Sequence, residues 1–222
     1  FDPMGYSKTA EVPSHGSPAA SYDITGGIGW TGMANLQRFV EDGGTLITLG
    51  NGSTLALDGG MAPRVRRARG GSAVWTPGVE LTASFLRAEH PISYGYSART
   101  SVFRSSYPVY SVRRVDRGLV VLQWGTRAPK ELREDESEEE KQSKEGEAKI
   151  PPLLVSGGIK GEEILEGQPA ILDIPVGKGR VLAYNFNPVY RELNRSDYRL
   201  LWNALLNWKR LGDEIAATVP KN

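Results

Sequence analysis

The sequence predicts an α/β domain built in three layers, with a sheet between helices. Short apolar runs such as Thr45–Leu49 have the length and composition of buried strands. Amphipathic stretches over residues 31–42 and 196–211 predict helices. Because a sheet and an amphipathic helix each need a surface that covers the apolar side, we expect both helices to pack on the faces of the sheet.

Composition sets the broad class of the protein. The chain has 222 residues, of which 39% are hydrophobic and 24% charged, as in an ordinary soluble globular protein. It has no run of about 18 apolar residues that would span a membrane. It begins with Phe1 rather than Met, so we expect a processed product or an excised fragment. The absence of cysteine excludes disulfides, thiolate zinc sites and a cysteine nucleophile.

A helix and a strand dominate the first quarter of the chain. Residues 1–21 are rich in Pro, Gly and Ser and are interpreted as a leader or linker. The helix that follows is capped by Thr31 and ends at Gly43-Gly44. Its predicted apolar face consists of Met33, Leu36, Phe39 and Val40. With the strand Thr45–Leu49 directly behind it, the helix forms one half of a βαβ unit.

The rest of the chain is richer in strands. We expect Leu119–Gln123 and Val181–Phe186 to join Thr45–Leu49 as central strands. A β-hairpin is predicted at Gly177-Lys178-Gly179. Ser196 is the expected cap of the last helix. The core face predicted for that helix consists of Leu200, Leu201, Ala204, Leu205 and Trp208.

Two charged clusters lie behind the formal net charge of +1. Residues 131–149 hold nine acids and four bases and almost no apolar residues, which predicts a flexible, solvated acidic loop. Arg64, Arg66, Arg67 and Arg69 form the basic cluster. Four arginines can grip phosphates, but no aromatic interleaving or nucleic-acid motif accompanies them, so a solvated loop rim is the favoured interpretation.

Five motifs in a fixed order resemble a known family. They are "YDITGGIGWTGMANLQRFVEDGGTLITLGNGS", "TPGVEL", "AEHPISYGY", "SSYPVYSV" and the closing block "VSGGIKGEEILEGQPAILDIPVGKGRVLAYNFNPVYRELNRSDYRLLWNALL". Together these motifs resemble the domain that follows the catalytic domain in large bacterial zinc carboxypeptidase-like proteins. The resemblance covers roughly residues 22–208, the scale of one domain.

The resemblance implies a flavodoxin-type, class I glutamine amidotransferase-like α/β domain with extra β-hairpins. It would span residues 22–211 and leave 212–222 as a tail. The zinc would belong to the peptidase domain of the parent protein, which this chain lacks. A zinc site of that family needs a His-x-x-Glu pair, and neither His15 nor His90 has Glu three residues later. We therefore expect no metal and no cofactor in this chain.

The turn after Thr45–Leu49 is where class I amidotransferases carry their catalytic cysteine. Here the turn holds Asn51, which cannot accept an acyl group, so glutamine hydrolysis is excluded. Ser53 follows, but outside a Gly-x-Ser-x-Gly pattern. His90 precedes Pro91 and is expected to order a turn rather than act as a base. The turn is therefore interpreted as part of the scaffold, with no catalytic residue.

Polar residues near the ends of two strands form a candidate ligand site. In α/β proteins, ligands usually bind beyond the carboxyl ends of the strands. The competing interpretation is that these side chains cap loops and the last helix, and it is favoured by about two to one. The candidate residues are Gly27, Asn51, Ser53, Asn185, Asn187, Tyr190 and Arg191.

Three hypotheses on function follow. The leading one is a non-catalytic accessory domain of a secreted zinc carboxypeptidase-like protein that serves packing, assembly or substrate presentation. The alternatives are a stand-alone binding module for a small polar ligand or sugar and an enzyme in its own right. The resemblance implies an extracellular or periplasmic location and the parent's peptidase domain as partner. Self-association stays open, and neither nucleic-acid binding nor membrane insertion is expected.

Overall fold

The computed structural model describes residues 9–11, 27–130, 151–192 and 194–211. The chain divides into two compact units, Phe1–Asn35 and Leu36–Asn222. The predicted acidic loop at 131–149, the 212–222 tail and most of the 1–21 leader lie outside the described residues. Within the described part of the chain, no helix is long and apolar enough to cross a bilayer.

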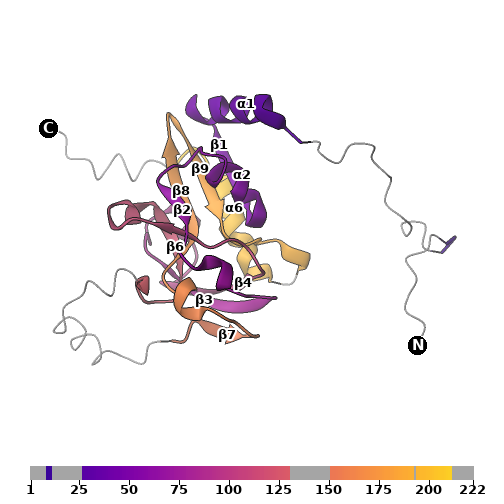
Figure 1. The fold of residues 1–222 in the computed structure, drawn as a ribbon, viewed down its shortest axis with the longest axis vertical. Helices are drawn as coiled ribbons and strands as arrows, with labels where there is room; N and C mark the ends of the chain where they lie inside the picture. Colours follow the sequence, from indigo (N-terminus) through magenta and orange to yellow (C-terminus); the bar gives the residue numbers. More distant parts are fainter. Residues whose placement is uncertain (1–8, 12–26, 131–150, 193, 212–222) are drawn as a thin grey trace. The chain divides into compact units, whose positions relative to one another are not determined.

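The second unit is built on one mixed, curled sheet (Figure 1). Its neighbouring strands, in order, are β1 (Thr45–Leu49), β9 (Gly179–Tyr184), β8 (Pro169–Val176), β6 (Val120–Trp124), β3 (Val79–Phe85) and β4 (Arg99–Arg104). The short strand β7 (Leu154–Ser156) also pairs with β3. The pair β1–β9 is parallel, and the other named pairs are antiparallel.

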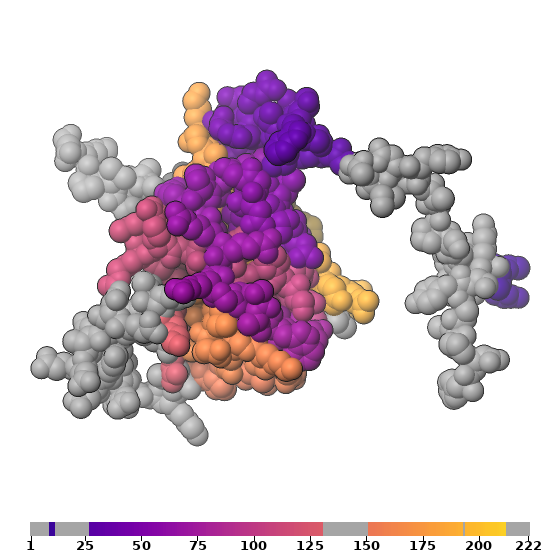
Figure 2. Space-filling model, viewed as in Figure 1, coloured from indigo at the N-terminus to yellow at the C-terminus, as the bar shows by residue number. Residues whose placement is uncertain are grey.

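Elements on both faces of the sheet produce an α/β arrangement. The helix α2 (Ser53–Leu57) lies against β9, and the ribbon of β2 (Val65–Arg67) and β5 (Tyr110–Val112) reaches β8. The purple segment that contains α2 and β2 lies across the face shown in Figure 2. The helix α6 (Tyr198–Leu206) packs through Leu200 and Ala204 into a core cluster with Leu182 and Tyr184 of β9. Two further helices are α1 (Gly29–Glu41) and α5 (Glu162–Leu165).

The predicted hairpin between β8 and β9 is confirmed. Val176 pairs with Gly179, which leaves Gly177 and Lys178 as a two-residue turn. Gly177 has a φ of 57°, the left-handed region that such turns require. A Cβ on Gly177 would also lie 2.7 Å from the backbone of Glu41, so the residue is fixed by packing as well as by conformation.

The sheet is mixed, whereas the βαβ unit that the sequence predicts is built on parallel strands. The predictions for Leu119–Gln123 and Val181–Phe186 match the interior strands β6 and β9 except at their ends, because Leu119 precedes β6 and Phe186 follows β9. In contrast, β1 is at the end of the strand order, with β9 as its described neighbour. The prediction of a central Thr45–Leu49 strand is therefore wrong. The β8–β9 hairpin explains why the sheet is mixed: it places β8, antiparallel, beside β9, where a doubly wound fold would need a helical crossover.

Both predicted helix caps are wrong. The helix α1 begins at Gly29, so Thr31 lies inside it. At the other end of the chain, α6 begins at Tyr198, and the Ser196 hydroxyl donates instead to Asn194 Oδ1 at 2.6 Å. Each Ser or Thr was the nearest good cap in the sequence, but the backbone begins to wind at a different residue.

The predicted apolar faces of the helices are only partly buried. In α1 the structure buries Val40, whereas Phe39 is 53% exposed. The last helix was predicted over 196–211, but α6 ends at Leu206. Within it Leu200 and Ala204 are fully buried and Leu205 is 44% exposed, and Trp208, beyond the helix, is 51% exposed. The apolar spacing predicted the helices, but the sheet covers a narrower stripe of α6 than expected. Because Val40 is the buried residue of α1, the prediction that this helix packs on a face of the sheet is wrong.

Candidate functional site

The strand β1 runs into a tight turn and then a helix. The turn is Gly50–Gly52, and Gly50 N donates to Phe186 O at 2.9 Å, which joins the ends of β1 and β9. Gly50 has a φ of 52°, and a Cβ there would lie 2.6 Å from the Tyr107 ring. The turn therefore needs glycine for its conformation and for the close approach of an aromatic ring. Asn51 is exposed at its tip.

Ser53, the hydroxyl nearest to this turn, is fully buried. Its Oγ donates to Tyr184 O at 3.1 Å and lies 3.1 Å from Thr48 Oγ1. A serine has one proton to donate and accepts one or two hydrogen bonds. Both roles are filled by groups of the sheet, so Ser53 fastens α2 to β9 and presents no nucleophile at the surface.

Asn185 and Asn187 stand just beyond β9. Asn185 is 4% exposed, and its main-chain N donates to Ala170 O at 2.8 Å. Its Oδ1 has no hydrogen-bond partner among the described residues. Asn187 Oδ1 accepts the Val189 N–H at 3.1 Å, which is a local turn bond. The Asn187 side chain is therefore used within its own loop, whereas Asn185 Oδ1 is a buried acceptor without a hydrogen bond among the described residues.

An aromatic stack follows this loop. The rings of Tyr190 and Phe103 stack with centroids 5.2 Å apart and an angle of 15°. The Arg191 guanidinium carbon lies 5.3 Å from the Tyr190 ring centroid, on its exposed side. Arg191 and Glu192 have φ values of 50° and 56°. Two successive non-glycine residues in this region are uncommon and store backbone strain, which tends to occur at ligand sites.

Tyr107 links the stack to the turn after β1. Burial is the main cause of the raised pKa of Tyr107; the neighbouring Tyr190 raises it further, and Arg104 opposes both. Arg104 is fully buried, and its guanidinium carbon lies 5.7 Å from the Trp124 ring centroid. It donates to Tyr107 O at 2.6 Å and to Ser105 O at 3.0 Å, and burial lowers its pKa to about 10. This arginine holds the Tyr107 segment in place.

The structure thus assembles part of the predicted site. The turn with Asn51 and the loop with Asn185 are joined by the bond between Gly50 and Phe186, and the Tyr107 ring lies against the Gly50 backbone of that turn. Ser53 points into the sheet, away from this group. Gly27 belongs to the first compact unit, which is described by itself.

Sequence reasoning missed Tyr107 and Phe103. Both come from the strand-rich middle of the chain, and their aromatic character alone did not distinguish them from core residues. The signal that could have found Tyr107 is its partner, Gly50, because a glycine directly after a strand indicates that something approaches the backbone closely.

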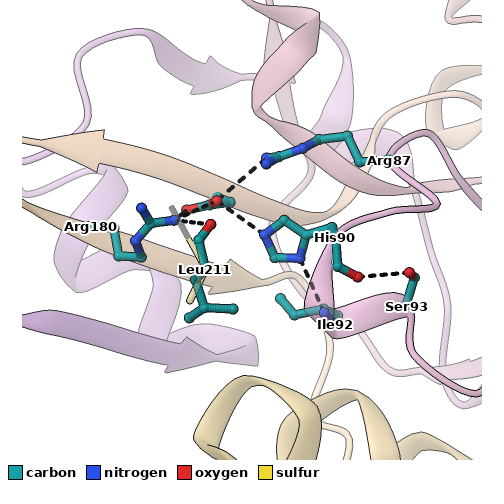
Figure 3. Close-up of polar contacts among 7 residues, drawn as sticks. Arg87, His90, Ile92, Ser93, Arg180 and Leu211 are labelled. Carbon is teal, nitrogen blue, oxygen red and sulfur yellow. Dashed lines mark hydrogen bonds and ion pairs between the residues drawn. The ribbon is translucent and has the colours of Figure 1, made fainter. Parts of the chain in front are cut away.

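A second polar cluster surrounds His90 and is drawn in Figure 3. His90 and Asp173 are both fully buried, and His90 Nε2 lies 3.1 Å from Asp173 Oδ2. The Ile92 N–H donates to His90 Nδ1 at 3.2 Å. Because an amide can only donate, Nδ1 is the acceptor of this bond, which leaves Nε2 to donate to Asp173.

Two arginines balance the buried Asp173 carboxylate. Arg180 donates to both of its oxygens, at 2.8 and 2.7 Å, and also to Leu211 O at 2.7 Å. Arg87 lies 3.4 Å from Asp173 Oδ2. Residues from β8, β9, the turn at Pro91–Ser93 and the end of the described chain are thereby tied together (Figure 3).

The cluster has the residue types of a Ser-His-Asp triad without its geometry. In such a triad, the serine hydroxyl bonds to an imidazole nitrogen. Here Ser93 Oγ donates to the His90 main-chain oxygen at 2.7 Å, and both ring nitrogens are occupied by other groups. The arrangement orders the turn, as the sequence predicted for His90. In the part of the chain that is described, no group of three or more His, Cys, Asp or Glu side chains could hold a metal ion.

Comparison with known proteins gives distant structural similarity. No family model matches the sequence, and no curated protein matches it. The chain is similar to a cytoplasmic protein, STM3548, of Salmonella typhimurium, with a TM-score of 0.39 and 14% identity over 79% of this chain. It is also similar to a ThuA-like protein of Bacteroides uniformis, with a TM-score of 0.39 and 13% identity over 79% of this chain. This chain spans 59% and 62% of the length of those two structures.

Proposed function

We propose that this chain is a non-catalytic accessory domain of a larger, secreted zinc carboxypeptidase-like protein. In that role it serves packing, assembly or substrate presentation, and the peptidase domain of the same polypeptide is its partner. The proposal starts from the five ordered sequence motifs between residues 22 and 208. It implies an extracellular or periplasmic location, and it assigns zinc to the peptidase domain alone.

One observation carries the non-catalytic part of the proposal. Acyl transfer needs a nucleophile with a base within hydrogen-bond reach. At the turn after β1 the exposed residue is Asn51, and the nearby Ser53 hydroxyl is buried against Tyr184 O. His90 is fully buried with both ring nitrogens occupied. These residues therefore supply structure and no reactive pair.

The proposed fold type is a glutamine amidotransferase-like one with an altered sheet. It is supported by the strand, tight turn and helix of β1 and α2, and by elements that cover both faces of the sheet. In such folds this turn carries the catalytic cysteine. This chain has the turn but carries Asn51 in it, which supports a fold that is retained without glutamine hydrolysis.

Activity assays test this proposal directly. The purified chain is incubated with C-terminal peptide, acyl-ester and glutamine substrates, with and without added zinc. We expect no turnover above buffer, and no tightly bound stoichiometric zinc in metal analysis. Turnover that is lost in a folded Ser53→Ala or His90→Gln variant would overturn the proposal. Retention in Asn51→Ala, an exposed matched variant, would exclude a general effect of mutation.

A small polar ligand at the strand ends is the second candidate function. It is favoured by the unsatisfied Asn185 Oδ1 and by the strained Arg191–Glu192 backbone beside the half-buried Tyr190 stack. Aromatic faces with nearby amides suit sugars and other neutral polar molecules. Titration of ¹⁵N-labelled protein with neutral mono- and disaccharides should shift amides of residues 185–192. If no amide moves at millimolar sugar, this candidate is removed.

A further inference from the structure

The helix α6 is apolar on two opposite sides. Its inner side buries Leu200 and Ala204 completely. On its outer side Trp202 is 56%, Leu205 44% and Leu206 76% exposed, and Trp208 follows at 51%. Trp202, Leu205 and Leu206 have the spacing i, i+3, i+4 and therefore share one side of the helix. A helix that is apolar all round is normally covered all round.

This outer side belongs to a helix that is firmly held. Asn203 Nδ2 donates to Ile92 O at 2.9 Å and to Tyr94 O at 2.8 Å, and Tyr184 Oη donates to Leu200 O at 2.9 Å. The exposed side chains therefore sit on a fixed support. A preorganised surface loses less conformational freedom on binding, which favours association. Tyr94, 51% exposed, extends the apolar surface beside Asn203.

The charged residues around the outer side of α6 indicate what kind of partner surface would bind there. Residues 198–211 contain three basic residues, Arg199, Lys209 and Arg210, and no acidic residue. Lys209 Nζ lies 5.2 Å from the Trp208 ring centroid, so one cation stands at the edge of the apolar surface. A second copy of this chain would bring like charges together, which disfavours self-association. Tryptophan and arginine are the residues that dominate protein interfaces energetically.

We propose that the outer side of α6, formed by Trp202, Leu205 and Leu206, docks on another folded protein domain together with Trp208 just beyond the helix. The contact surface of that domain is apolar at its centre and acidic at its rim. The inference rests on the proposed function, because it takes the partner to be the peptidase-containing remainder of the same natural polypeptide. It adds the surface through which the accessory domain is held.

The test measures binding between this chain and the separately produced remainder of its natural polypeptide by calorimetry. Leu206→Glu places a charge in the centre of the surface at a side chain that is 76% exposed, so the fold should be retained. We expect affinity to fall about tenfold or more, as for a central interface residue. Val115→Glu is the matched control, because Val115 is 81% exposed on another element, and it should leave affinity unchanged.

Salt and competing partners complete the test. An acidic rim predicts weaker binding as salt rises from about 0.05 to 0.5 M, because screening shortens the reach of the charges. Unchanged affinity in Leu206→Glu, or binding insensitive to salt, would overturn the proposal. So would tight binding to phosphatidylglycerol vesicles with a tryptophan blue shift, or a dimer in sedimentation that Leu206→Glu dissolves.

Failure of this inference can be told from failure of the proposed function. If the remainder binds through another surface and this chain stays inactive, the accessory role stands and the α6 docking surface is wrong. If the chain itself hydrolyses substrate, or its natural polypeptide has no peptidase domain, the proposed function is wrong instead.

Discussion

Replacing Asp197 with Asn is expected to stabilise the second unit above neutral pH. Asp197 is 1% exposed; its Oδ2 accepts the Phe103 N–H at 3.1 Å, and its Oδ1 has no partner within the described residues. Burial raises its pKa to about 7, with a further contribution from the Glu80 carboxylate, while the Phe103 N–H acts in the opposite direction. The ionised carboxylate is therefore an unfavourable group in the folded protein.

The sign of the pH dependence follows from this raised pKa. Between about pH 4 and pH 7 the folded protein holds a proton that an unfolded aspartate, with a pKa near 3.9, has lost. The stabilising contribution is fully present below about pH 4 and is lost as pH rises through about 7. A difference of about three pKa units corresponds to about 4 kcal/mol. We expect Asp197→Asn to raise the free energy of unfolding at pH 8.5 by about 2–3 kcal/mol. The gain is smaller than about 4 kcal/mol because the uncharged amide loses the favourable interaction of a carboxylate with the start of α6.

Urea unfolding at a series of pH values between about 4 and 8.5 measures this effect. The free energy of unfolding of the wild type should fall across the range, and that of Asp197→Asn should fall less. Glu192→Gln, which removes an exposed carboxylate from the same segment, serves as control. If the two curves for wild type and Asp197→Asn run parallel, or if the variant is the less stable at pH 8.5, the reasoning is refuted.

Three further predictions concern stability. Asp173→Ala removes the buried carboxylate that Arg87 and Arg180, both partly buried, contact, and it should cost about 3–5 kcal/mol in urea unfolding; a loss below about 1 kcal/mol would contradict the role assigned to the cluster. Ser53→Ala removes the bond to Tyr184 O and should cost about 1–2 kcal/mol, so an unchanged midpoint would count against it. Gly50→Ala meets both a φ of 52° and the Tyr107 ring and should cost about 1–3 kcal/mol; a more stable variant would show that the turn is not constrained.

The predicted site shows where sequence reasoning reached and where it stopped. Asn51 and Asn185 were selected because polar residues after strands often lie together, and β1 and β9 are indeed neighbouring parallel strands. Ser53 was selected on the same ground, yet its hydroxyl turns inward to Tyr184 O. The sequence shows that Ser53 follows the strand, but it does not show which way the side chain points. That direction is set by an acceptor on the neighbouring strand, Tyr184 O.

The sequence by itself determined the local features of this protein. The β8–β9 turn follows from Gly177, because its backbone conformation is one that other residues adopt with strain. The absence of a cysteine nucleophile follows from composition alone. Such features depend on a few adjacent residues, so no knowledge of distant contacts is needed.

Only the tertiary structure decided which distant segments meet. His90 and Asp173 are 83 residues apart and form a buried pair, with Arg180 completing the charge balance. The sheet order that places β1 at one end and the exposed outer side of α6 likewise depend on what packs beside each element. Apolar periodicity predicts which side chains of a helix or strand are buried. It does not predict the element that they pack against, because the hydrophobic effect is non-directional and any complementary apolar surface can bury them.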